Sequence, residues 1–143
     1  MDDLVQRLSA LRSLIREVNL LTQHLITLRS HLPTGTTKYS SAPRGGKTGD
    51  PVARVATDIA DVSRMLEQRR ADCVAEMKRL YTFIDSIEDS LIRLIMTLRY
   101  LEGKSWREVA VAIGESDEQY PRRHHNRCLE NLTDDQIRIL YEE

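Results

Sequence analysis

Residues 94–132 carry three helix patterns separated by only a few residues, and this spacing constrains the fold more than any other feature of the chain. In the first helix, apolar residues recur at steps of three and four, so that they share one face. They are Ile87, Leu91, Leu94, Leu98 and Leu101. We expect this helix to end at Gly103, because glycine adopts the left-handed conformation at a helix C-terminus without strain. Ser105 and Glu108 then match the capping box that opens a helix.

Similar local patterns predict the second and third helices. The second helix should end at Gly114 and bury four residues on one side. These are Trp106, Val109, Ala110 and Ile113. Ser116 with Gln119 suggests another capping box, which would open the third helix. Residues 105–132 therefore have the proportions of a helix-turn-helix.

Pro121 leaves two possible starts for the third helix. If the helix begins at Ser116, the proline lies in its interior and should bend it. If the helix begins later, Pro121 is its first residue and residues 117–120 form an extended turn. We favour the later start, with a short helix over residues 121–132.

The same stretch resembles region 4 of the sigma-70 type RNA polymerase factors. A Leu-Arg-Tyr helix end, a glycine, a serine cap, Glu-Val-Ala, Ile-Gly-x-Ser and a final Arg-x-Leu-x-x-Leu carry the resemblance. The matching residues are Leu98, Arg99, Tyr100, Gly103, Ser105, Glu108, Val109, Ala110, Ile113, Gly114, Ser116, Arg127, Leu129 and Leu132, with Cys128 where the family usually has alanine. The resemblance implies a helix-turn-helix that contacts promoter DNA and RNA polymerase. The helical arms before it resemble small phage late transcriptional regulators of the ArpU/RinA kind.

The third helix is predicted to present four polar side chains to DNA. They are Gln119, Arg122, Arg123 and Asn126, opposite an inward face of Tyr120, His124, Cys128 and Asn131. In the major groove, arginine pairs with guanine, and glutamine or asparagine pairs with adenine. Phosphate contacts are expected from Lys104, Ser105, Arg107 and Arg127. In the alternative interpretation, the two adjacent arginines form a solvated face that neutralises Asp117, Glu118 and Glu130.

Charge is divided unevenly along the chain. Residues 1–84 contain 13 basic and 9 acidic residues, a net charge of +4, whereas residues 85–143 contain 8 and 13, a net charge of −5. Because phosphate contacts supply most non-specific DNA affinity, the acidic half should bind DNA weakly alone. Binding would then require dimerisation, the basic linker described below, or a protein partner such as RNA polymerase.

Residues 2–31 are predicted to form one amphipathic helix with heptad spacing. Its stripe comprises Leu4, Leu8, Leu11, Ile15, Val18 and Leu25, widened by Leu14, Leu21 and Leu28. Such a wide stripe requires a partner helix. A membrane-surface helix is the weaker alternative, because the polar face carries few lysines and no aromatic anchors. With no membrane span and no signal peptide, we expect a location in the cytoplasm of a bacterial host.

Residues 33–49 are rich in Gly, Ser, Thr and Pro and are predicted to be a flexible linker. The segment Gly45–Thr48 resembles the end of a phosphate-binding loop, but the glycine and the strand that this motif needs are missing. Lys38, Arg44 and Lys47 could touch a DNA backbone; a solvated linker is the alternative.

Asp50 followed by Pro51 predicts the start of a second long helix. Its apolar stripe is interrupted at Arg69 and resumes further on, and a break is expected near Asp85, where Ser86 with Asp89 could cap the next helix. Two long helices of similar length suggest an antiparallel coiled-coil-like hairpin, within one chain or exchanged between two. The expected domains are residues 1–84 and residues 85–143. A capping box at Thr133 opens a short last helix that should pack through Leu129 and Leu132.

Residues suited to catalysis or metal binding do not cluster in the sequence. The four histidines lack cysteine or carboxylate partners at ligand spacing. Cys73 and Cys128 are expected to be ordinary thiols of a reducing compartment. Neither an enzyme nor a cofactor is predicted.

The sequence therefore predicts an all-α protein with a long helical hairpin followed by a sigma-region-4-like helix-turn-helix. Its expected function is sequence-specific regulation of transcription by binding double-stranded DNA as a homo-oligomer, with a dimer favoured. Two alternatives remain: a DNA-packaging subunit that forms a large closed ring, and a module that binds RNA polymerase or another protein without touching DNA.

Overall fold

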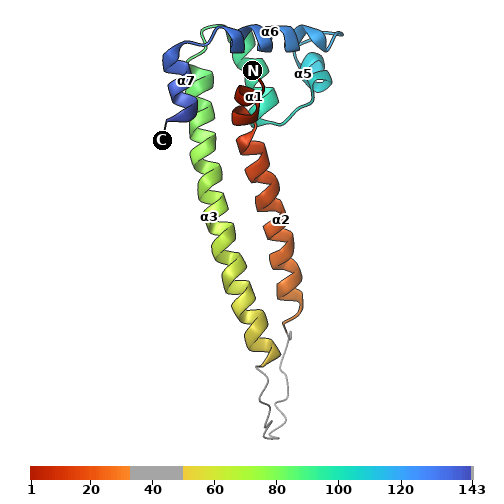
Figure 1. Ribbon diagram of the computed structural model, residues 1–143. Helices are drawn as coiled ribbons and strands as arrows, with labels where there is room; N and C mark the ends of the chain where they lie inside the picture. The colour runs from red at the N-terminus through yellow and green to blue at the C-terminus, as the bar shows by residue number, and fades with distance from the viewer. Residues whose placement is uncertain (33–49, 143) are drawn as a thin grey trace, which may run out of the picture. The chain divides into compact units, whose positions relative to one another are not determined.

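The computed structural model describes residues 1–32 and 50–142, and every regular element in these ranges is helical (Figure 1). This confirms the predicted all-α class. The linker residues Lys38, Arg44 and Lys47 lie outside the described residues. The elements are α1 (Asp2–Leu8), α2 (Ala10–Ser30), α3 (Pro51–Asp85), α4 (Ser90–Met96), the π-helix η1 (Thr97–Leu101), α5 (Trp106–Ala112), α6 (Gln119–Glu130) and α7 (Asp134–Tyr141).

The chain divides into two compact units, and the division differs from the predicted boundary after residue 84. Unit 1 comprises Met1–Ile15 and Asp72–Glu143, and unit 2 comprises Arg16–Ala71. The reason is that the N-terminal residues share a hydrophobic core with the C-terminal half of the chain. Leu8 of α1 lies in the same buried cluster as Phe83 of α3 and Leu140 of α7.

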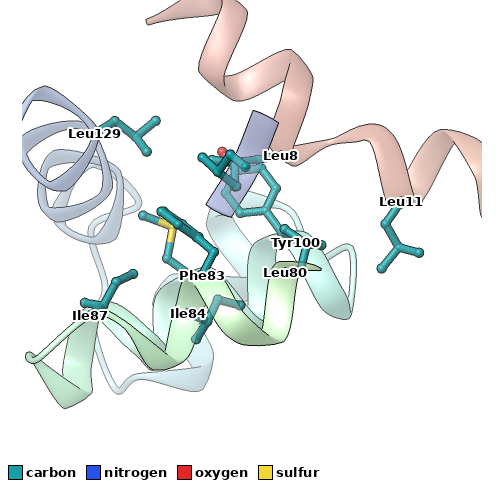
Figure 2. Packing of buried hydrophobic residues seen from close by; sticks show 10 residues of the cluster. Leu8, Leu11, Leu80, Phe83, Ile84, Ile87, Tyr100 and Leu129 are labelled. Carbon is teal, nitrogen blue, oxygen red and sulfur yellow. The ribbon is translucent and has the colours of Figure 1, made fainter. Parts of the chain in front are cut away.

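The core of unit 1 is built from helices that are far apart in the sequence. Figure 2 shows side chains from α1, α3, η1 and α6 pointing toward one another. Leu8, Phe83 and Met96 are fully buried in it, at 0% exposure. The other buried members are Leu11, Leu80, Ile84, Ile87, Tyr100, Leu129 and Leu140.

The predicted single helix over residues 2–31 is interrupted at Ser9, which separates α1 from α2. The Ser9 hydroxyl donates a hydrogen bond to the carbonyl oxygen of Val5 at 2.7 Å. Serine bonds of this kind, made back to the preceding turn, bend helices. The predicted apolar stripe is still the buried one, since Leu8, Leu11 and Leu25 are each at most 6% exposed.

In unit 2, residues 16–30 of α2 and 51–71 of α3 run in opposite directions. Glu17 pairs with Arg69 at 2.8 Å, whereas Leu28 lines a groove with Asp58 and Val62. Leu25 and Leu66 are the buried hydrophobic residues between the two segments. Two helices alone cannot surround all of their apolar side chains. Several large apolar side chains therefore remain exposed to solvent. Leu20, Ile26 and Met65 are 58%, 54% and 51% exposed.

The α3 helix begins and ends where expected, but the cap of the next helix differs. Asp50 Oδ1 accepts a hydrogen bond from the backbone N–H of Val52 at 3.0 Å, and α3 ends at Asp85. The predicted cap at Ser86 is wrong: Asp89 is the N-cap of α4, and its carboxylate accepts bonds from two backbone N–H groups. The Ser86 hydroxyl instead donates to the carbonyl oxygen of Phe83.

The predicted apolar face of residues 87–101 is also wrong in part. Ile95, Met96 and Tyr100 are buried, whereas Leu94 is 44% exposed. Helix α4 begins only after its N-cap Asp89, so Ile87 does not lie on the same helix as Leu91. The π-helix η1 then widens one turn, with the Glu102 N–H donating to the Thr97 carbonyl oxygen at 3.0 Å.

At the C-terminus, the Thr133 capping box opens α7 as predicted. Leu129, Leu132 and Leu140 belong to one hydrophobic cluster. The α7 helix also contacts α1, because Arg7 Nε donates to the Leu140 carbonyl oxygen at 2.6 Å. Among the described helices, no stretch is both long enough and apolar enough to cross a lipid bilayer.

Candidate nucleic-acid interface

Helix α5 is bounded by the local features predicted from the sequence. Glu108 N–H donates to Ser105 Oγ at 3.2 Å, and Ser105 N–H donates to Glu108 Oε2 at 2.8 Å, which completes the capping box. Gly103 and Gly114 flank the helix with φ angles of +69° and +82°, values that favour glycine. Val109 and Ala110 are buried, and Trp106 and Ile113 are half-buried, so the predicted inward face of α5 is confirmed.

Helix α6 begins at Gln119 and does not use the predicted Ser116 cap. The Asp117 carboxylate instead accepts a hydrogen bond from the backbone N–H of Gln119 at 2.9 Å. Pro121 is thus the third residue of the helix, neither its first residue nor an interior one. A residue in the first turn has no intrahelical acceptor for its N–H, so proline costs no hydrogen bond there.

The inward face of α6 is displaced by one residue from the predicted one. Pro121, His125 and Leu129 are buried. Of the residues expected to face inward, Tyr120, His124 and Cys128 are half-buried, and Asn131 is exposed. The displacement follows from the neighbours of α6. His125 lies against the ring of Trp106 on α5, at 4.8 Å between centroids, and Leu129 joins the core of unit 1.

Most of the predicted base-contact residues of α6 are exposed to solvent. Gln119, Arg122 and Arg123 are exposed, whereas Asn126 is half-buried. An Arg123 nitrogen lies 3.5 Å from the Asp117 carboxylate. This pair is solvent-exposed, and exposed pairs contribute little, so the arginine can exchange it for another anion.

The predicted phosphate-contact residues are also exposed. Lys104, Ser105 and Arg107 lie at the start of α5, and Arg127 lies on the outer side of α6. Lys104 and Arg107 line a shallow hollow on α5. Helices α5 and α6 pack against each other, so both groups of residues belong to one small substructure.

A buried histidine at the centre of this substructure was missed by the sequence analysis. His125 is 2% exposed. Its Nε2 lies 2.5 Å from the Tyr100 hydroxyl of η1, and its Nδ1 lies 2.8 Å from Asn126 Oδ1. The Arg99 guanidinium in turn covers the Trp106 ring at 4.6 Å. The histidine therefore joins η1, α5 and α6. The signal that could have found it is its four-residue spacing from Pro121 and Leu129.

The His125 imidazole and the Tyr100 phenol, which form this hydrogen bond, are both uncharged at neutral pH. Burial lowers the pKa of His125; the hydrogen bond with Asn126 opposes this effect, and the positive charges of Arg99 and Arg122 add to it. Burial raises the pKa of the Tyr100 phenol well above its ordinary value, against the opposing charge of Arg99. At neutral pH the two side chains therefore share an uncharged hydrogen bond.

The stability of the protein should consequently depend on pH through His125. Because its pKa is lowered in the folded state, the unfolded chain binds the proton more readily, so the stabilising contribution is present above the unfolded pKa of about 6.5 and is lost as the pH falls below it. The difference in free energy of unfolding between wild type and His125→Gln should shrink from pH 7.5 to pH 5. Urea titrations at each pH measure it. A constant difference would mean that this histidine does not titrate in the expected way.

Within residues 1–32 and 50–142, no three His, Cys, Asp or Glu side chains are placed together to hold a metal ion. Cys73 and Cys128 are half-buried and are not joined in a disulfide.

Comparison with protein families, with curated proteins and with solved structures finds no match to this chain.

Proposed function

We propose that this chain is a sequence-specific DNA-binding transcriptional regulator in which α5 and α6 act as a helix-turn-helix. One observation carries the proposal. Helix α6 packs on α5, with His125 against the Trp106 ring, and Arg122 and Arg123 of the same helix remain exposed. A second helix whose free side carries arginines has the residue types that read base edges in the major groove.

Neighbouring basic and hydroxyl side chains would position this helix on the duplex. Lys104, Ser105 and Arg107 lie exposed where the chain enters α5, and phosphates would pass there. Arg127 lies one turn beyond Arg123 on the same helix and would contact the other side of the groove. Lys38, Arg44 and Lys47 of the linker are further candidates for backbone contacts.

The acidic residues near the arginines argue for binding as an assembly. Glu118, the N-cap of α6, and Glu130, its last residue, are exposed and would repel phosphates. Two binding units joined together recover affinity that one lacks. The exposed Leu20, Ile26 and Met65 of unit 2 support self-association of the helical arm, with a dimer as the favoured state.

The resemblance of residues 94–132 to sigma region 4 adds RNA polymerase as a proposed second partner. The helical arms resemble those of the phage late regulators. We therefore propose that the protein acts in the cytoplasm of a bacterial host during phage growth. A purely protein-binding function is the second candidate. It is favoured by exposed apolar residues near the same substructure, with Leu94 at 44% and Val111 at 72% exposure.

Selection of bound fragments from a random DNA pool tests the proposal. The full chain, at moderate salt, should enrich one motif made of two related half-sites, and the spacing of the half-sites reports the geometry of the dimer. If no motif is enriched even at low salt, where backbone attraction is strongest, direct readout by α6 is refuted, and the protein-binding candidate replaces it.

A further inference from the structure

The protonation of His125 can be deduced from its buried neighbour. Tyr100 is 2% exposed, and a buried hydroxyl donates its hydrogen to an acceptor. The atom in place to accept it is His125 Nε2, at 2.5 Å. Tyr100 therefore donates to Nε2, and this nitrogen carries no hydrogen of its own.

The remaining proton of the imidazole then decides how Asn126 is oriented. A neutral imidazole without a hydrogen on Nε2 carries it on Nδ1. Because Nδ1 lies 2.8 Å from the Asn126 side chain, it donates to that side chain and requires an oxygen opposite it. The carbonyl oxygen of Asn126 therefore faces the interior, and its NH₂ group is left for other partners.

From this arrangement we infer that His125 is a positioning residue that makes Asn126 a hydrogen-bond donor toward DNA, so that Asn126 reads guanine in preference to adenine. The inference rests on the proposed DNA-binding function. Reading adenine needs both the oxygen and the NH₂ of an amide, because adenine presents one acceptor and one donor in the major groove. Guanine presents two acceptors, N7 and O6, which suit a group that only donates.

This conclusion replaces the adenine contact expected for Asn126 from residue type alone. The half-burial of Asn126 agrees with it, since Asn126 Oδ1 lies 2.8 Å from Nδ1 of the buried His125. Gln119 and the arginines have no such constraint from His125 and keep their predicted contacts.

The first test needs no DNA. A long-range ¹H–¹⁵N correlation spectrum of the full-length protein at pH 7.5 identifies which imidazole nitrogen of His125 carries the hydrogen. The expected result is a protonated Nδ1 and an unprotonated Nε2. A protonated Nε2 would overturn the inference and leave the proposed function untouched.

The second test compares DNA selections for wild type, Asn126→Ala and Asn126→Asp. The position whose preference disappears in Asn126→Ala should be guanine in wild type, favoured over adenine by roughly 5- to 150-fold. In Asn126→Asp, the outward atom becomes an acceptor, so the same position should change to cytosine, which offers a donor. Adenine at that position in wild type, or no change in Asn126→Ala, would overturn the inference while the regulator proposal stands. Failure of wild type to enrich any motif would overturn both.

A third variant separates positioning from simple structural support. Tyr100→Phe keeps the ring in the core but removes the hydroxyl that holds Nε2 without a hydrogen. The guanine preference at the Asn126 position should narrow by several-fold, while the preferences at the other positions persist. An equal loss of base preference at every position of the DNA site would show that Tyr100 and His125 only support the fold.

Discussion

Replacing both arginines of α6, in the variant Arg122→Ala/Arg123→Ala, is expected to weaken binding to the selected DNA site by roughly 10²- to 10⁴-fold. Each bidentate contact of an arginine to guanine contributes about 1–3 kcal/mol of discrimination, and both contacts are lost. Both side chains are exposed, so the free energy of unfolding should change by less than about 0.5 kcal/mol. Equilibrium titrations with the selected site and with a random fragment of equal length measure the effect.

A charge-matched control distinguishes base contacts from general attraction. Arg54→Ala/Arg64→Ala removes the same charge from exposed positions on α3, and it should weaken binding to both fragments by only a few-fold. The α6 variant should lose much more affinity for the selected site than for the random fragment. Equal losses on the two fragments would mean that Arg122 and Arg123 contact only phosphates.

Truncation of Phe83 should have the largest effect on stability. Phe83→Ala is expected to lower the free energy of unfolding by about 3–5 kcal/mol, as buried phenylalanine truncations do. Phe83 is 0% exposed and belongs to the cluster that joins α1, η1, α6 and α7 to α3. Stability of a domain this size is about 5–15 kcal/mol in total, so the variant should remain folded only near room temperature or below. Urea denaturation followed by circular dichroism provides the measurement.

The matched control lies two residues earlier on the same helix. Tyr81 is another aromatic residue of α3, but it is 57% exposed, and Tyr81→Ala should change the free energy of unfolding by less than about 0.5 kcal/mol. Similar losses for the two variants would contradict the described core, because they would mean that α3 buries a different face.

The helix boundaries predicted at three local caps are confirmed, whereas the caps predicted at Ser86 and Ser116 are not used. The capping boxes at Ser105 and Thr133 and the start of α3 at Asp50 are present as expected. Each depends on hydrogen bonds between residues at most three apart, and the left-handed conformation of Gly103 depends on that residue alone. Such features need no information from the rest of the chain.

Predictions that depended on helical phase were less accurate. The face of α6 was displaced by one residue, and the face of α4 was assigned to Leu94 in place of Ile95 and Met96. The spacing of apolar residues defines the possible faces of a helix, but its tertiary neighbours decide which face turns inward: on α6, His125 lies against the Trp106 ring and Leu129 joins the core of unit 1. On α4, the break before the N-cap Asp89 also separates Ile87 from the helix that carries Leu91.

By itself, the sequence of this protein therefore determined its helical class, most of the caps and turns, and the candidate residues on the outer side of α6. Only the tertiary structure decided that residues 1–15 join unit 1, that Phe83 lies in its core, and that Tyr100, His125 and Asn126 form one connected group. The physical reason is distance along the chain. Caps form between near neighbours, whereas Tyr100 and His125 are 25 residues apart, and only the packing of η1, α5 and α6 brings them within hydrogen-bonding distance.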